Sequence, residues 1–379
     1  MASPRRHVAV VVPSLTRAGA ERVAETLARE FARFAKVTIV TMEPRLGPRD
    51  LNGSAPLPWA DRIPVGCAHT HLPSSGSGLS RLGPLVVRFA ALARQQQFDA
   101  VYSFLTWTNV LVSVARLLGG RYVHVASEHA LADSLRGEGG QLKTLAKTLP
   151  VIYRGPHWIV VVSDAVRDSL LGAGLLPRPE RAVTIPNPVD GAEIRKLADA
   201  PCQISLPKTG QFVLMCVARL HPQKDHLTVL RAMTRLPKSY SLVLVGDGAY
   251  RSTLQEAVSR LGLGNRVVFA GVLENPYPLM RQAHAIVLAS REEGFGLVAA
   301  EAAALGIPFV GSRVGGLEEV CALLGHQTFP VGDEKALASA VLKVSRQRGV
   351  SSASDTVGRL FDPIKISHDY LRLASHSLS

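Results

Sequence analysis

Short apolar runs alternate with helical patterns along nearly the whole of this 379-residue chain. Apolar runs of this kind fit strands that are buried on both faces, and their alternation with helices indicates parallel α/β sheets. Ala20–Phe34 shows the helical pattern, because its apolar residues recur at every fourth position. Pro44 to Gly83 is rich in proline, glycine and serine, and is expected to form a long surface excursion. The first series of strands is predicted at His7–Pro13, Lys36–Thr41, Asp99–Phe104, Tyr122–Ser127, Trp158–Ser163 and Ala182–Ile185.

A second series of strands and helices follows the stretch PNPVDGAEI, Pro186 to Ile194, whose prolines indicate a linker. The chain also exceeds the roughly 250–300 residues over which one hydrophobic core keeps growing. We therefore expect two doubly wound α/β domains, 1–186 and 187–359, and a closing helix at Asp362–Ala374. The second series of strands is predicted at Phe212–Ala218, Leu242–Gly246, Arg266–Gly271, Ala285–Ser290, Pro308–Ser312 and Thr328–Val331.

Composition limits the class of protein. A hydrophobic content of 47% with 19% charged residues is typical of a globular protein with a substantial core. No apolar run approaches the about 18–20 residues of a membrane span. The run His7–Val12 follows a basic start but is too short for a signal peptide and stops at Pro13. We expect a cytoplasmic protein whose scattered cysteines are reduced thiols, since they form no CxxC pair. These are Cys67, Cys202, Cys216 and Cys321.

The net charge of +13 is concentrated in the first half of the chain. Up to Pro186 there are 22 Lys and Arg against 13 Asp and Glu, and beyond it 21 against 17. This excess favours an anionic partner there, either a phosphate-bearing acceptor or an anionic membrane at whose inner face the protein is peripheral. An ordinary solvated basic surface is equally compatible with it. Nucleic acid is disfavoured, because aromatic content is 6% and the basic residues form no stripe.

Ligands of such sheets bind beyond the carboxyl ends of the strands, so the loops there are the candidate sites. Gly19 precedes a helix after the first strand, and Arg219 and Lys224 follow Phe212–Ala218. Arginine binds phosphate bidentately and lysine binds it as a point charge. VGDGAY contains Gly246, where a glycine turn allows close backbone approach. The fourth loop, SREEGFGLVAAEAA, sets Glu292 and Glu293 before a glycine loop that opens a helix, and a third carboxylate, Glu301, after it.

The stretch GFGLVA also matches the dinucleotide-binding fingerprint G-x-G-x-x-A. That fingerprint belongs in the first strand–helix turn of its domain, whereas this copy follows the fourth strand of the second series. An NAD-dependent oxidoreductase, with Glu318 as the acidic residue, nevertheless remains one alternative function. The sequence contains no Walker A motif, no GxSxG elbow, no HExxH and no Asp-x-Asp pair.

The series Arg219, Lys224 and Glu293-x7-Glu301, with GFG between the carboxylates, resembles the retaining GT-B glycosyltransferases of family 4. VARLHPQKD, LVLVGDG, VVFAGVL and GSRVGGLEEV resemble that family's successive strand-end loops, and RAGAERV and ASEHA resemble two of its N-terminal loops. The resemblance spans nearly the whole chain and is stronger in the C-terminal half. Ala18 departs from it, because the family usually has a glycine pair there.

The resemblance implies two Rossmann-like domains that face each other across a deep cleft. Residues 1–186 would bind the acceptor and 187–359 the nucleotide-sugar, with the C-terminal helix, about residues 360–379, packed back on the first domain. The donor diphosphate would take the amides of Phe295, Gly296 and Leu297 and the helix dipole.

The same resemblance gives roles to the remaining site residues. Arg219 and Lys224 would offset the negative charge of the diphosphate. Glu301 would accept hydrogen bonds from the ribose, and Glu293 would accept them from the donor sugar. The base would lie near Gly246–Gly248 and meet the backbone at Val272. In the N-terminal domain, His129 is similar to the histidine that approaches the donor sugar, Glu128 would face the acceptor, and Gly19 would approach the donor through its backbone.

We therefore expect a retaining glycosyltransferase that moves a sugar from a UDP- or GDP-sugar to a glycan, lipid-linked or small-molecule acceptor. The resemblance implies front-face displacement, in which the leaving phosphate takes the acceptor proton and no protein nucleophile is needed. No metal and no cofactor are expected, because the nucleotide-sugar is a co-substrate and the carboxylates serve hydroxyl groups. A non-catalytic sugar-nucleotide-binding protein is the second alternative.

Overall fold

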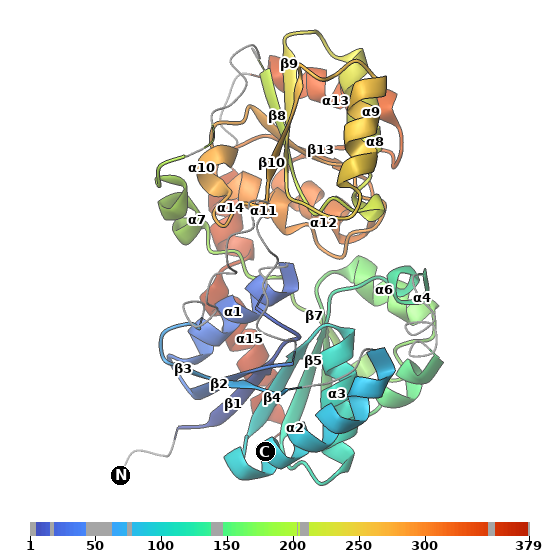
Figure 1. The fold of residues 1–379 in the computed structure, drawn as a ribbon. Helices are drawn as coiled ribbons and strands as arrows, with labels where there is room; N and C mark the ends of the chain where they lie inside the picture. The colour runs from blue at the N-terminus through green and yellow to red at the C-terminus, as the bar shows by residue number, and fades with distance from the viewer. Residues whose placement is uncertain are drawn as a thin grey trace. The chain divides into compact units, whose positions relative to one another are not determined.

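The computed structural model describes residues 5–15, 19–42, 63–73, 78–137, 147–202, 204, 212–347 and 353–377. They form two compact units (Figure 1). The first unit takes residues up to 188 and from 363 onward, and the second takes residues 189–362. The sequence placed the boundary after residue 186 and the return near residue 360. The second unit is thus inserted into the first, and the chain comes back to complete the first at its end.

The first unit is built on a seven-stranded parallel sheet of order β3-β2-β1-β4-β5-β6-β7. The order reverses direction between β1 and β4, where Val8 pairs with Ala100 in parallel register. That reversal is the switch point of a Rossmann-like sheet. Its strands are β1 (His7–Val11), β2 (Lys36–Thr41), β3 (Cys67–His71), β4 (Ala100–Phe104), β5 (Val123–Glu128), β6 (Trp158–Val161) and β7 (Ala182–Thr184).

Helices cover both faces of this sheet, because successive side chains of a strand point to opposite faces. Ala9 and Val101 pack into the core under α2 and α3, whereas Val8 and Tyr102 face α15. Figure 1 shows α2 and α3 on one face and α15 on the other. The larger helices are α1 (Gly19–Phe31), α2 (Leu82–Gln96), α3 (Thr106–Leu117), α6 (Asp164–Gly172) and α15 (Pro363–His376), and α4 (Ala132–Gly137) is short.

The second unit is built on a six-stranded parallel sheet of order β10-β9-β8-β11-β12-β13. Its switch point lies between β8 and β11, where Leu214 pairs with Ala285. Its strands are β8 (Phe212–Val217), β9 (Tyr240–Val245), β10 (Val267–Gly271), β11 (Ala285–Leu288), β12 (Phe309–Ser312) and β13 (Gln327–Phe329). Its helices are α7 (Gly191–Ala198), α8 (His226–Arg235), α9 (Arg251–Arg260), α10 (Tyr277–Met280), α11 (Leu297–Ala304), α12 (Gly315–Leu324), α13 (Glu334–Arg346) and α14 (Ala353–Leu360).

Two expectations about the connecting segments were wrong. The excursion Pro44 to Gly83 contains strand β3, which the polar sequence CAHTH concealed, although its residues 44–62 and 74–77 lie outside the described ranges. The linker Pro186 to Ile194 ends early, because α7 begins at Gly191. Asp190 caps that helix by accepting a hydrogen bond from the Glu193 amide at 2.9 Å. Within the described ranges, no helix is both long and apolar enough to cross a membrane.

Candidate functional site

The residues singled out in the second half of the sequence come from four loops at one edge of the second sheet. Val272 follows β10, Gly246 follows β9, Arg219 and Lys224 follow β8, and loop 289–296 follows β11. These strands are neighbours in the order β10-β9-β8-β11, and all of them run parallel. Their carboxyl ends therefore meet at one edge, where open α/β sheets bind ligands.

Lys224 and Glu293 form an ion pair at this edge. Lys224 Nζ donates to Glu293 Oε2 at 2.5 Å, and the Ser290 hydroxyl donates to the same oxygen at 3.2 Å. The two side chains are only 16% and 18% exposed, so little water screens the pair. The sequence assigned these residues to different ligand groups and did not predict that they contact each other. The pair holds both charged groups in place at the end of the sheet.

Asp225 adds a second link between the same two loops. Its backbone is left-handed, with φ of 43°, and its Oδ1 caps α8 by accepting from the Thr228 amide at 3.4 Å, while its Oδ2 accepts from the Thr228 hydroxyl at 2.9 Å. The same oxygen, Oδ2, pairs with Arg291 Nε at 3.1 Å. Asp225 was not among the residues expected at the site, although an Asp just before an apolar helical run is a capping signal. Asp225 therefore fixes the direction in which the chain leaves Lys224.

Gly296 gives the glycine loop its shape. It is left-handed, with φ of 87°, and a Cβ there would lie 2.5 Å from Leu317 Cδ1. Phe295 beside it is buried and packs edge-to-face on Phe361, with ring centroids 5.4 Å apart. Leu297 is the first residue of α11, and the first amides of a helix have no acceptor within the helix. The loop thus presents a helix N-terminus that a buried ring and a close glycine contact hold in position.

Glu301 lies one turn into α11 and is 1% exposed. The Tyr277 hydroxyl donates to its Oε1 at 3.4 Å. Glu301 is therefore not a solvated charge on the surface of the helix. A buried carboxylate needs hydrogen-bond donors, and the hydroxyl of Tyr277 is one that the sequence did not predict.

The turn at Gly246 interlocks with the loop after β8. A Cβ on Gly246 would lie 2.0 Å from the carbonyl oxygen of Ala218, and φ at Gly246 is 133°. The Leu220 amide donates to the Asp247 carbonyl at 2.9 Å, which fastens the two loops together. Arg219 between them is exposed, and Val272 on the next loop is 51% exposed. The glycine is therefore needed for the contact between the loops themselves.

In the first unit, Glu128 is fully buried and accepts four hydrogen bonds. Its donors are the Tyr153 hydroxyl at 2.5 Å, the Thr106 hydroxyl at 2.8 Å, and the amides of His129 at 2.9 Å and Ala130 at 3.2 Å. Burial raises the pKa of its carboxyl group, while the four donors act in the opposite direction. The expectation that Glu128 faces an acceptor was wrong, because its oxygens are used to fix the loop that starts at His129.

His129 is linked to the C-terminal helix through Ser127. Its Nε2 lies 3.1 Å from the Ser127 hydroxyl, which lies 3.0 Å from the hydroxyl of Tyr370 on α15. Burial lowers the pKa of His129 to about 3, so the ring is neutral at physiological pH. It can therefore serve as a hydrogen-bonding group but not as a cation. No sequence pattern indicated the part that Tyr370 plays here.

Gly19 is the first residue of α1 and is exposed, whereas Ala18 before it lies outside the described ranges. Glu21 in the first turn of α1 is buried and accepts a hydrogen bond from the Ser14 hydroxyl. This carboxylate makes the start of α1 less favourable for an anion than the start of α11. Across the described part of the chain, no three His, Cys, Asp or Glu side chains are grouped as metal ligands would be.

Two protein-family models match the chain in succession. The model described as Glycosyltransferase Family 4 matches residues 17–193, and the model described as Glycosyl transferases group 1 matches residues 211–347. Among solved structures, the chain is similar to Anabaena HepE in complex with UDP and glucose, with a TM-score of 0.78 and 21% identity over 97% of this chain and 99% of that one. It is equally similar to sucrose-phosphate synthase from Thermosynechococcus elongatus, with a TM-score of 0.78 and 20% identity over 99% of each chain.

Two curated relatives extend the comparison. An N-acetylgalactosamine-N,N'-diacetylbacillosaminyl-diphospho-undecaprenol 4-alpha-N-acetylgalactosaminyltransferase from Campylobacter jejuni is 24% identical over 96% of this chain and 98% of its own length. The N-acetyl-alpha-D-glucosaminyl L-malate synthase of Bacillus anthracis is 43% identical, but over only 29% of this chain and 30% of its own length. The paired Rossmann-like sheets match GT-B structures, and the two family models together account for most of the chain. Along most of its length, the chain is therefore similar to glycosyltransferases of the family 4 type.

Proposed function

We propose that the protein transfers a sugar from a nucleoside-diphosphate sugar to a glycan, lipid-linked or small-molecule acceptor, with retention of anomeric configuration. The observation that carries this proposal is the grouping of Lys224, the start of α11 and Glu301 at the carboxyl edge of one sheet. A cation and a helix N-terminus suit a diphosphate, and a carboxylate one turn further suits a polyol. An NAD-binding function is not favoured, because the GFGLVA loop follows β11 and not the first strand of its unit.

The relatives support a UDP-sugar as the first donor to test, since HepE was solved with UDP-glucose. They also support a lipid-linked glycan acceptor, since the full-length C. jejuni relative is named for a diphospho-undecaprenol-linked acceptor. In this proposal Arg219 and Lys224 bind the diphosphate, together with the amides of Phe295, Gly296 and Leu297. Gly246 and Val272 lie beside the base, and Gly19 approaches the donor through its backbone. Each of these roles is open to substitution and binding measurements.

The proposed reaction uses no protein nucleophile, and the leaving phosphate accepts the proton of the acceptor hydroxyl. The ion pair of Glu293 supports this, because a carboxylate that is bonded to an ammonium group is a weaker nucleophile. We assign Glu293 to the hydroxyls of the donor sugar and neutral His129 to a hydrogen bond with the substrate. The protein would then accelerate the reaction by positioning and by stabilising charge on the leaving group.

Glu301→Gln is expected to weaken the binding of UDP or GDP by about 1.5–3 kcal/mol, because it removes the charge from the hydrogen bonds to the ribose. This corresponds to about a 10-fold to 150-fold rise in Kd. Isothermal titration calorimetry with UDP and GDP measures the change. Glutamine keeps the size of the side chain and can still accept from Tyr277, so we expect little loss of fold.

The matched control is Glu319→Gln, on helix α12 of the same unit and outside the proposed site. Its Kd for the nucleotide should equal that of the wild type. An unchanged Kd in Glu301→Gln, with a normal unfolding temperature, would remove Glu301 from the nucleotide site. Binding of NADH in preference to every UDP- or GDP-sugar would overturn the proposed function as a whole.

Transfer is expected to continue in the presence of EDTA. Arg219 and Lys224 supply two positive charges, and the start of α11 supplies about half a charge. Lys224 has two further N–H donors besides the one that bonds Glu293, so the pair does not prevent it from binding phosphate. The rate should be measured after dialysis against EDTA and again after addition of magnesium or manganese. Loss of activity on chelation and its return with metal would contradict this mechanism.

A further inference from the structure

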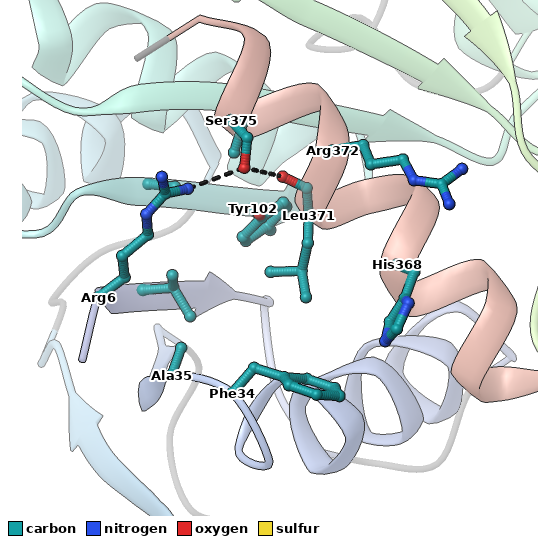
Figure 2. Close-up of a pocket in the computed structure, with 11 residues that line it drawn as sticks. Arg6, Phe34, Ala35, Tyr102, His368, Leu371, Arg372 and Ser375 are labelled. Carbon is teal, nitrogen blue, oxygen red and sulfur yellow. Dashed lines mark hydrogen bonds between the residues drawn. The ribbon is translucent and has the colours of Figure 1, made fainter. Parts of the chain in front are cut away.

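The last helix of the chain, α15, packs on the sheet of the first unit and brings Tyr370 to the end of β5. Figure 2 shows Tyr102 of β4 beside this helix, and the bond of 2.8 Å from Arg6 Nη1 to the Ser375 hydroxyl. The Tyr102 hydroxyl donates to the backbone carbonyl of Tyr370 at 3.5 Å, and the two rings lie 6.2 Å apart. These contacts hold Tyr370 in place beside Ser127, from which it is 243 positions away in the sequence.

Tyr370, Ser127 and His129 form a chain of three hydrogen-bonding groups. The Tyr370 hydroxyl lies 3.0 Å from Ser127 Oγ, which lies 3.1 Å from His129 Nε2. Phe104 packs against both ends of the chain, with its ring centroid 6.2 Å from that of Tyr370 and 6.0 Å from that of His129. Both hydroxyl groups belong to residues that are 1% exposed, and within the described ranges neither has a further partner. Each therefore depends on this chain for its hydrogen bonds.

The direction of these bonds follows from the need of each buried hydrogen for an acceptor. If Tyr370 donates to Ser127, and Ser127 donates to His129 Nε2, both hydroxyl hydrogens are bonded. If Nε2 carried a hydrogen, it would donate to Ser127, and one of the two hydroxyl hydrogens would find no acceptor in the described part of the chain. A phenol is also a stronger hydrogen-bond donor than an aliphatic alcohol. The bonds therefore run from Tyr370 to His129 and leave Nε2 unprotonated.

We propose that Tyr370 is a positioning residue for sugar transfer, which through Ser127 holds His129 in the tautomer that carries its hydrogen on Nδ1. Burial lowers the pKa of His129 to about 3, so the ring is neutral and carries a single hydrogen. Neutral histidine in water prefers the hydrogen on Nε2, so the chain selects the less common form. The ring is only partly buried, and no described residue bonds Nδ1. Nδ1 is thus free to donate to an oxygen of the donor sugar, a step that rests on the proposed function, whereas the tautomer does not.

The tautomer can be read in the free protein from two-bond proton–nitrogen correlation spectra after labelling histidine with heavy nitrogen. The chain has 12 histidines, and the signals of His129 are those that disappear in His129→Asn. We expect a protonated Nδ1 in the wild type. Tyr370→Phe removes one oxygen and keeps the ring that packs on Phe104, and it should shift His129 towards a protonated Nε2. The matched control, Tyr102→Phe, removes a hydroxyl group from the same interface but not from the chain, and should keep the wild-type tautomer.

The same variants test the part that Tyr370 plays in the reaction. Tyr370→Phe is expected to lower kcat about fivefold to tenfold with little change in KM for the donor, because part of the His129 population would no longer offer a hydrogen to the developing charge. Tyr102→Phe should keep the wild-type kcat. An asparagine amide can donate from about the position of Nδ1, so His129→Asn should retain part of the activity. Tyr370→Phe should have no further effect in that background, since asparagine has no tautomer to select.

A protonated Nε2 in the wild type, or an unchanged tautomer in Tyr370→Phe, would overturn the inference whether or not the protein transfers sugar. An equal loss of kcat from Tyr370→Phe in the wild type and in His129→Asn would show that Tyr370 acts only on the fold, and would overturn its role as a positioning residue. The proposed function fails in a different way, through the absence of binding of every sugar nucleotide. That result would remove the sugar oxygen from the inference and leave the measured tautomer as it is.

Discussion

Lys224→Met is expected to lower the rate of sugar transfer about thirtyfold or more. The change removes the ammonium group that offsets the developing charge of the leaving diphosphate, which should cost at least about 2 kcal/mol at the transition state. Methionine keeps most of the length of the side chain, so the fold should survive. The measurement is kcat/KM for transfer, or for donor hydrolysis if the acceptor is not yet known, together with the thermal unfolding temperature.

The ion pair with Glu293 complicates this experiment, because Lys224→Met also leaves a partly buried carboxylate without its partner. The double variant Lys224→Met with Glu293→Gln separates the two effects. If the missing cation at the diphosphate causes the loss, the double variant stays at least as slow as the single one. Recovery of activity in the double variant would show that the unpaired carboxylate was responsible. Lys238→Met, at an exposed position of the same unit, is the control and should retain full activity.

Gly246→Ala is expected to destabilise the second unit by about 3 kcal/mol or more. A Cβ would lie 2.0 Å from the carbonyl oxygen of Ala218, and the atom that it meets is backbone, which cannot rotate away as a side chain could. The φ of 133° adds strain for any residue other than glycine. Only a few mechanisms lower the free energy of unfolding by this much, and a forced steric clash is one of them. Urea unfolding followed by circular dichroism measures the difference.

Two glycines of the same unit separate the causes of this loss. Gly262 has a φ of 67° and no described heavy atom within 4 Å of its Cβ position, so Gly262→Ala reports the backbone strain alone. Gly264 also has open space around it, and Gly264→Ala should be nearly neutral. The expected order of loss is Gly246, then Gly262, then Gly264. If Gly246→Ala lost no more stability than Gly262→Ala, the contact with Ala218 would not be the cause.

The strands that the sequence predicted are those buried on both faces, because such strands must be apolar at nearly every position. Val8 to Val11 and Leu242 to Val245 are of this kind and are fully buried. Strand β3 was not predicted because its sequence, CAHTH, has no apolar pattern. The strand lies at the edge of its sheet and is only partly buried, so its side chains do not have to be apolar.

The sequence indicated each loop of the candidate site separately, but it did not predict which side chains of these loops contact one another. Loops after strands are recognisable from glycines and charges, whereas strand order is a property of the folded sheet. The pairing of β8 with β11 brings Lys224 to Glu293, and no local pattern records that pairing. The sequence likewise could not show that the carboxylate of Glu128 accepts hydrogen bonds from four groups of its own unit. Burial of a carboxylate depends on residues such as Tyr153, which is 25 positions away.

The return of the chain to its first unit also has a consequence for biosynthesis. A ribosome completes the whole of the second unit, residues 189–362, before it makes α15. Until then Tyr102 lacks Tyr370, Ser127 lacks the hydroxyl of that same tyrosine, and Arg6 lacks Ser375. The first unit therefore emerges first and is completed last. Until the second unit has been translated, α1 alone packs on the part of that sheet face around Tyr102, and the area that α15 covers stays open. A stop codon that removed only the last 17 residues would leave the second unit intact and the first permanently incomplete.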